Sequence, residues 1–163
     1  MGLTEMDEYW MKIALEKAEE AFQAEEVPVG AVIVESSGRH FADRNRTAET
    51  GMPTSHAEHL VITAAAEDRE DWRLEGCTLY STLEPCLMCA GLALLARIPR
   101  IVFGAQDKRF GAFGSVTDVL KMQGLNHYPE VFGGYYEDES ARLLKEFFRL
   151  GRKKKKAKGD TND

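Results

Sequence analysis

The chain has 163 residues, of which 44% are hydrophobic and 29% are charged, and its formal net charge is −6. This length and composition fit one globular domain whose core is large enough to fold without disulfide bonds. The first ten residues are acidic and polar, which excludes a secretory signal. No apolar run approaches the roughly 20 residues that cross a bilayer. The sequence therefore predicts a soluble, cytoplasmic protein without a membrane segment.

The basic residues are unevenly distributed, since seven of the 21 lie between Arg149 and Lys158. A basic terminal run can contact nucleic-acid phosphates, or it can be a solvated tail, and its composition leaves both interpretations open. We expect residues 1–151 to form a single domain and residues 152–163 to form a basic, disordered tail.

Hydrophobic periodicity and turn residues divide the chain into helices and strands. In chain order, the expected elements are a helix over 6–24, strands over 31–34 and 40–44, a helix over 56–67, a strand over 78–83, a helix over 85–97, strands over 101–104 and 130–132, and a helix over 137–150. Thr54 and Ser55 are candidate N-caps for the second helix. Strands that alternate with helices predict a three-layer α/β/α sandwich around a mixed five-stranded sheet.

Two segments carry metal-binding residue types: His56-Ala57-Glu58 and, further along, Pro85-Cys86-Leu87-Met88-Cys89. Both lie where a helix is expected to begin, and the partial positive charge of a helix N-terminus favours thiolate at a cysteine. One imidazole and two thiolates leave a fourth position open for water, as in catalytic zinc sites, whereas structural zinc sites usually have four protein ligands. The sequence therefore predicts a catalytic zinc ion bound by His56, Cys86 and Cys89.

Glu58 lies two residues after His56, and neighbours at that spacing do not face each other along a regular helix. This spacing disfavours Glu58 as a ligand and leaves its carboxylate to move protons. The pattern H-x-E followed by P-C-x-x-C is the known signature of zinc nucleobase deaminases. The predicted reaction is hydrolytic: zinc lowers the pKa of water, the water oxygen adds to an amine-bearing ring carbon, and Glu58 carries protons until ammonia leaves.

Other interpretations of the cysteine pair fit the sequence less well. A structural zinc ribbon needs a second cysteine pair, which a chain with three cysteines lacks. A redox C-x-x-C pair would leave the H-x-E segment unexplained. His40, His59 and His127 could each add a fourth ligand, although surface or core roles are favoured for them. Cys77 lies in an apolar stretch and is expected to be a buried core residue.

Several further stretches resemble the bacterial tRNA-specific adenosine deaminases, a branch of the zinc-dependent deaminase superfamily. They are EVPVGA (26–31), TLEPC (82–86), MCAG (88–91), VFGA (102–105) and FFR (147–149). The zinc motifs define only the broad superfamily, whereas the VFGA-x-D stretch is more specific to this branch. The resemblance implies a cytidine deaminase-like fold, a homodimer, and zinc-dependent conversion of adenosine to inosine at the wobble position of a tRNA anticodon.

The resemblance also implies substrate-binding roles at individual positions. Asn45 would hold the flipped purine, and Asp107 would contact the ribose of a neighbouring nucleotide. Asn126 and Phe148 would contact the anticodon loop, where an aromatic ring suits a stacked base. Apolar positions after the cysteines, such as Leu95, could face either a partner subunit or the sheet.

The chain departs from this family pattern in the loop after residue 105. Gln106 stands where a basic residue is frequent, and Phe110 and Phe113 stand where small residues are usual. Two other functions remain open at this point. One is a zinc-dependent deaminase of free guanine, adenine or cytosine bases or nucleosides. The other is a catalytically silent partner subunit that keeps zinc for structure, against which the intact Glu58 argues.

Overall fold

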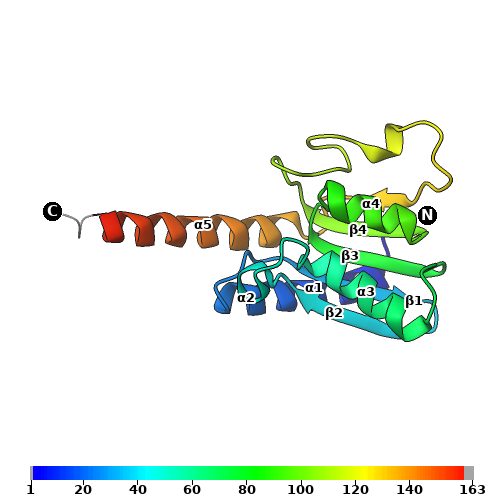
Figure 1. Cartoon of the computed structure of the whole chain (residues 1–163), viewed down its shortest axis with the longest axis horizontal. Helices are drawn as coiled ribbons and strands as arrows, with labels where there is room; N and C mark the ends of the chain where they lie inside the picture. The colour runs from blue at the N-terminus through cyan, green and yellow to red at the C-terminus, as the bar shows by residue number, and fades with distance from the viewer. Residues whose placement is uncertain (1, 160–163) are drawn as a thin grey trace.

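The computed structural model describes residues 2–159, which are built around a five-stranded sheet in the order β2-β1-β3-β4-β5 (Figure 1). The strands are β1 (Gly30–Glu35), β2 (His40–Arg44), β3 (Cys77–Leu83), β4 (Arg100–Ala105) and β5 (Glu130–Phe132). Strand β1 is antiparallel to both β2 and β3, whereas β3, β4 and β5 are parallel to one another. The predicted mixed sheet of five strands is therefore confirmed.

Helices cover both faces of this sheet. The helical elements are α1 (Glu5–Gln23), α2 (Thr47–Thr50), α3 (Ala57–Arg69), α4 (Leu87–Leu95), the short 3-10 helix η1 (Val119–Lys121) and α5 (Glu137–Gly159). Helix α1 packs on one face, and α3 and α4 pack on the other. Helix α5 contacts α1, β3 and β4 and places Leu144 against the core cluster on the α3 and α4 side. This arrangement is the expected three-layer α/β/α sandwich.

The core follows the two-residue period of the strands. Along β1, Ala31 and Ile33 pack toward α3 and α4, whereas Val32 and Val34 pack toward α1. Because successive strand side chains point to opposite faces, the continuous apolar run of β1 supplies both halves of the core. Gly30 permits the closest approach of α1, since a Cβ atom there would lie 2.0 Å from the carbonyl oxygen of Ala14.

A buried ionic network joins α1 to the centre of the sheet. The Asp7 carboxylate is 1% exposed, and it accepts hydrogen bonds from the Tyr80 hydroxyl (2.6 Å) and from Arg100 Nη1 (2.6 Å) and Nη2 (2.8 Å). It also accepts from the backbone N–H of Thr4 (2.7 Å), the N-cap of α1. One carboxylate thus caps α1 and binds groups from β3 and β4.

Three sequence-based expectations are wrong in detail. The last helix does not end at Leu150, because α5 continues to Gly159. The expected disorder after residue 151 is therefore wrong for residues 152–159. Residues 160–163 lie outside the described part of the chain. Lysines are good helix formers, and Lys154 pairs with Glu25 at 2.5 Å. Neither Thr54 nor Ser55 caps α3, whose N-cap is His56.

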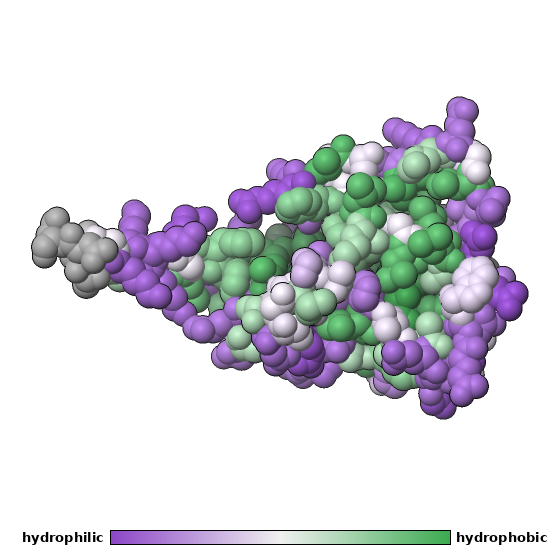
Figure 2. Space-filling model, in the orientation of Figure 1, coloured by the Kyte–Doolittle hydropathy of each residue, from purple (hydrophilic) through white to green (hydrophobic). Residues whose placement is uncertain are grey.

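The surface follows the uneven charge distribution of the sequence. Figure 2 shows hydrophilic residues along the far part of α5 and hydrophobic residues gathered over the body of the molecule, on the side where Figure 1 draws α3 and α4. No helix within residues 2–159 is both long and apolar enough to cross a membrane.

Candidate zinc and substrate site

The three predicted zinc ligands lie where two helices begin on the same face of the sheet. His56 is the N-cap residue of α3, and Cys86 is the N-cap residue of α4. Cys89 is buried in the first turn of α4. Strand β3 ends at Leu83, and the short connection through Pro85 brings the α4 N-terminus beside that of α3. The expectation that both motif segments lie at helix starts is therefore confirmed.

The spacing of these side chains fits one tetrahedral zinc ion. His56 Nδ1 lies 3.5 Å from Cys86 Sγ and 3.6 Å from Cys89 Sγ, and the three donor atoms all lie within 4.8 Å of one another. Zinc bonds of about 2.3 Å to sulfur and about 2.0 Å to nitrogen, at the tetrahedral angle, separate the two donors by about 3.5 Å. No other group of metal-binding side chains of this kind occurs within residues 2–159.

The site stabilises a thiolate at Cys86. Hydrogen bonds from the Cys89 thiol and from His56 lower the pKa of Cys86 to about 4, against the opposing effect of burial. The same contact with Cys86, together with burial, raises the pKa of Cys89. The hydrogen bond to Cys86 also raises the pKa of His56. A thiolate is the form of cysteine that binds zinc, so Cys86 is suited to the ion in advance, whereas Cys89 would release its proton when zinc binds.

Glu58 is buried in the first turn of α3, beside the donor group. Its Oε2 accepts from the Cys89 thiol at 3.8 Å, and its Oε1 lies 2.7 Å from the Ser81 hydroxyl. Burial raises the pKa of Glu58, although the hydrogen bond from Ser81 opposes that shift. A raised pKa brings a carboxyl group closer to neutrality, where it can both accept and release a proton.

Ser81 is suited to both protonation states of Glu58. Its hydroxyl oxygen also lies 2.7 Å from the carbonyl oxygen of Leu83. A hydroxyl has one hydrogen and two lone pairs. Ser81 can therefore donate to Glu58 when that carboxylate is ionised. When Glu58 is protonated, Ser81 can accept from it and donate to Leu83.

A cavity of about 810 Å³ opens beside these residues. Its wall includes side chains from the α3 and α4 N-termini, from the loop after β4 and from α5. Among the predicted site residues, those in this wall are Asn45, His56, Glu58, Cys86, Asp107 and Phe148. The fold thus brings together six of the eight predicted site residues in one wall, with Cys89 in the adjoining donor group.

Asn45 connects this cavity to the start of α3. Its Oδ1 accepts from the backbone N–H of Ala57 at 2.9 Å. Asn45, which directly follows β2, thus satisfies a donor at the N-terminus of α3 that Thr54 or Ser55 was expected to satisfy. The Asn45 amide group has a donor as well as an acceptor. Because the acceptor is used by Ala57, the amide nitrogen remains available to a molecule in the cavity.

The loop after β4 is held by a buried carboxylate, Glu84. Glu84 accepts from the backbone N–H groups of Asp107 (3.4 Å), Phe113 (3.0 Å) and Ser115 (3.3 Å), and from the Ser115 hydroxyl. Gly111 lies against it, since a Cβ atom there would be 2.3 Å from Glu84 Oε2. The carboxylate therefore fixes the backbone that forms one side of the cavity.

The rim of the cavity combines aromatic and basic side chains. Phe148 of α5 is 39% exposed, and the Arg109 guanidinium lies 5.6 Å from the centroid of its ring. Lys108 and Lys145 also line the cavity. Asn126 does not line it and lies exposed in the segment before β5. Within this chain, Asn126 is therefore not brought together with the other predicted substrate residues.

Sequence reasoning overlooked two residues that support the site, Ser81 and Glu84. Ser81 lies near the end of β3, Glu84 directly follows this strand, and both polar side chains are buried. That pattern is a signal, because a buried polar group requires hydrogen-bond partners. It could have indicated a functional or supporting role, but not which atoms the two side chains contact.

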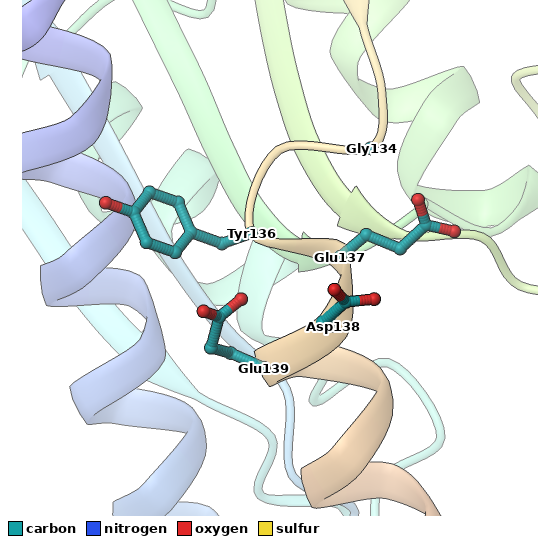
Figure 3. A pocket seen from close by; sticks show the side chains of 5 residues that line it. All are labelled: Gly134, Tyr136, Glu137, Asp138 and Glu139. Atoms are coloured by element: carbon teal, nitrogen blue, oxygen red, sulfur yellow. The ribbon is translucent and has the colours of Figure 1, made fainter.

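A second hollow lies at the start of α5, lined by Gly134 and residues 136–139 (Figure 3). Figure 3 shows Tyr136 pointing toward α1, while Glu137 points to the opposite side. Three of its four lining side chains are carboxylates. It contains neither histidine nor cysteine, and we assign no function to it.

Comparisons with known proteins agree with this geometry. The family model of the cytidine and deoxycytidylate deaminase zinc-binding region matches residues 4–105. The chain is 45% identical to a tRNA-specific adenosine deaminase of Bacillus subtilis (strain 168), over 93% of this chain and 94% of the relative. It is 43% identical to a protein of the same name from Aquifex aeolicus (strain VF5), over 87% of this chain and 93% of the relative.

A solved structure from a study of A-to-I editing by tRNA:A34 deaminases at the wobble position of transfer RNA is also similar. It superposes with a TM-score of 0.80 at 43% identity, covering 84% of this chain and 99% of that one. The resemblance inferred from the sequence motifs is confirmed by these relatives, and zinc is the cofactor of the matching family. The chain therefore belongs to the family of zinc-binding cytidine and deoxycytidylate deaminases.

Proposed function

We propose that this protein is a tRNA-specific adenosine deaminase, which converts adenosine to inosine at the anticodon wobble position and releases ammonia. The observation that carries the proposal is the 45% identity to a relative of that name over nearly the full length of both chains. The basic and aromatic rim of the cavity supports it, because single-stranded RNA binds to proteins through phosphates and stacked bases.

The proposed zinc ligands are His56 Nδ1 and the sulfur atoms of Cys86 and Cys89. When bound there, zinc would lower the pKa of a water molecule and so supply the nucleophile near neutral pH. Glu58 is the proposed proton carrier, taking a proton from the attacking water and delivering it to the purine ring and then to the departing amine. Its burial and its contact with Ser81 support this role, since they let it hold or release a proton.

The proposed substrate contacts come from three elements. The Asn45 amide nitrogen would donate to the purine, and Asp107 would accept from the ribose of a neighbouring nucleotide. Phe148 would stack on a base of the anticodon loop. Asn126 remains a proposed anticodon contact, although it lies outside the cavity wall, so it would have to meet RNA elsewhere on the surface or beside a second subunit.

We also propose a homodimer in the cytoplasm. On α4, Leu87 and Leu95 are exposed by 60% and 70%, and this helix lies on the side of the molecule where Figure 2 shows hydrophobic residues gathered. Such exposed apolar area favours a protein interface. Leu95→Glu should therefore reduce the sedimentation coefficient if α4 faces a partner. The three free cysteines are compatible with a reducing compartment.

The test is to incubate the zinc-loaded protein with tRNA, an anticodon stem-loop RNA, free adenosine and free guanine, and to measure inosine and ammonia. Inosine at the wobble position with little turnover of free substrates is expected. Turnover of only the free compounds would favour a nucleobase or nucleoside deaminase. Glu58→Gln, checked for unchanged zinc content, should abolish ammonia release, and equal background rates in both proteins would favour a silent subunit.

A further inference from the structure

Phe110 is an exposed aromatic side chain at the rim of the cavity. It is 68% exposed and lines the same cavity as Glu58 and His56. A phenylalanine left in water forgoes the stabilisation that burial of its ring would give. Its place at the cavity rim makes this exposed ring available to a molecule that is bound in the cavity.

The loop presents Phe110 in a defined position. Asp107 Oδ1 accepts from the backbone N–H groups of Arg109 (2.9 Å) and Phe110 (3.2 Å). Just beyond Phe110, Gly111 lies against the buried Glu84, which binds backbone on both sides of this turn. The backbone that carries the ring is thus held by the partly exposed Asp107 and by the buried Glu84.

The surroundings of Phe110 indicate the chemistry of its partner. Lys108, Arg109 and Lys145 line the same cavity, and Arg109 lies over the ring of Phe148. Basic side chains beside exposed aromatic rings match the phosphates and bases of a single-stranded nucleic acid. An apolar protein partner would leave these charges without counterions. The charge pattern therefore favours RNA.

We propose that Phe110 stacks on an unpaired base next to the target adenosine and so helps to determine which RNA loops the enzyme accepts. This inference rests on the proposed function, since it needs a substrate longer than one nucleoside. Unpaired loop bases are commonly splayed out and stacked on aromatic side chains. The loss of one such stack weakens binding by about tenfold.

The experiment compares the zinc-loaded full-length protein with Phe110→Ala and Phe110→Trp on a synthetic anticodon stem-loop RNA that carries adenosine at the wobble position. Phe110→Ala should raise KM about tenfold with little change in kcat, whereas Phe110→Trp should keep a KM close to that of the wild type. Removing the base from one nucleotide beside the target should raise the KM of the wild type about tenfold. The same abasic RNA should leave the KM of Phe110→Ala unchanged, because the two changes remove the same contact.

Trp72→Ala is the matched control. Trp72 is another exposed ring near two guanidinium groups, those of Arg73 and Arg97, but it does not line the cavity. Its removal should leave KM unchanged, and an equal rise in KM would overturn the proposal. An unchanged KM in Phe110→Ala, no coupling to any abasic position, or a Phe110→Ala protein that changes oligomeric state would also overturn it.

The two proposals fail in distinguishable ways. If the wild type edits the stem-loop and Phe110→Ala edits it equally well, only the stacking role is lost. If the wild type edits no RNA but turns over free nucleosides, the proposed function fails and the stacking role fails with it.

Discussion

Replacing Asp7 by asparagine removes the charge at the centre of the network that joins α1 to β3 and β4. Burial alone would raise the pKa of Asp7, but hydrogen bonds from Arg100, Tyr80 and the backbone of Thr4 outweigh it and lower the pKa from 3.8 to about 2. A shift of this size corresponds to about 2 kcal/mol of folding free energy. Asp7→Asn should lose about that much stability at pH 7.

The pH dependence has a defined sign. Because the folded-state pKa is lowered, the contribution of Asp7 is fully present above the unfolded value of 3.8 and is lost as the pH falls toward 2. Urea unfolding of the zinc-loaded proteins, followed by circular dichroism, should therefore give a constant difference from pH 7 to about pH 5. The difference should begin to shrink below about pH 4.

Glu8→Gln provides the control on the same helix. Glu8 forms an exposed ion pair with Lys12 at 2.8 Å, and exposed pairs of this kind contribute little. Its loss should leave the urea midpoint nearly unchanged. The reasoning about Asp7 is refuted if Asp7→Asn is as stable as the wild type at pH 7, or if its loss of stability is the same at pH 3 as at pH 7.

Three further predictions concern the site. Ser81→Ala should lower kcat about tenfold with zinc content unchanged, because a hydrogen bond to a charged group is lost. Since this hydrogen bond lowers the pKa of Glu58, its loss should raise that pKa further and move the acid limb of the pH–rate profile to higher pH. Gly111→Ala should lower both Tm and activity, since the new Cβ would meet Glu84 Oε2 at 2.3 Å, and an unchanged Tm would contradict the described loop. A zinc chelator should abolish activity and make the partly exposed Cys86 thiol reactive toward a thiol reagent while the buried Cys77 and Cys89 stay protected, and zinc should reverse both effects.

Much of the site could be predicted because its chemistry is local in the chain. The spacing of Cys86 and Cys89 places both in one helical turn, and the residue types themselves limit the metal to a soft or borderline ion. The N-cap of α3 could not be predicted in the same way. Thr54 and Ser55 have the right side chains, but the backbone N–H of Ala57 donates to Asn45, which directly follows β2.

The continuation of α5 past Leu150 shows a similar limit. A basic run has good helix propensity and also the composition of a solvated tail, so the sequence alone allows either state. The helix extends to Gly159, and one lysine of the run pairs with Glu25, more than a hundred residues earlier.

The order of residues along the chain determined the strands, the helices, the donor set and the family, because hydrophobic period and ligand spacing act over a few residues. Tertiary structure alone decided that His56 Nδ1 meets the two sulfurs, that Ser81 contacts Glu58 and that Phe110 stands at the cavity rim. These contacts join segments from different strands and helices. Their geometry depends on how the sheet packs against both layers of helices, which no local pattern encodes.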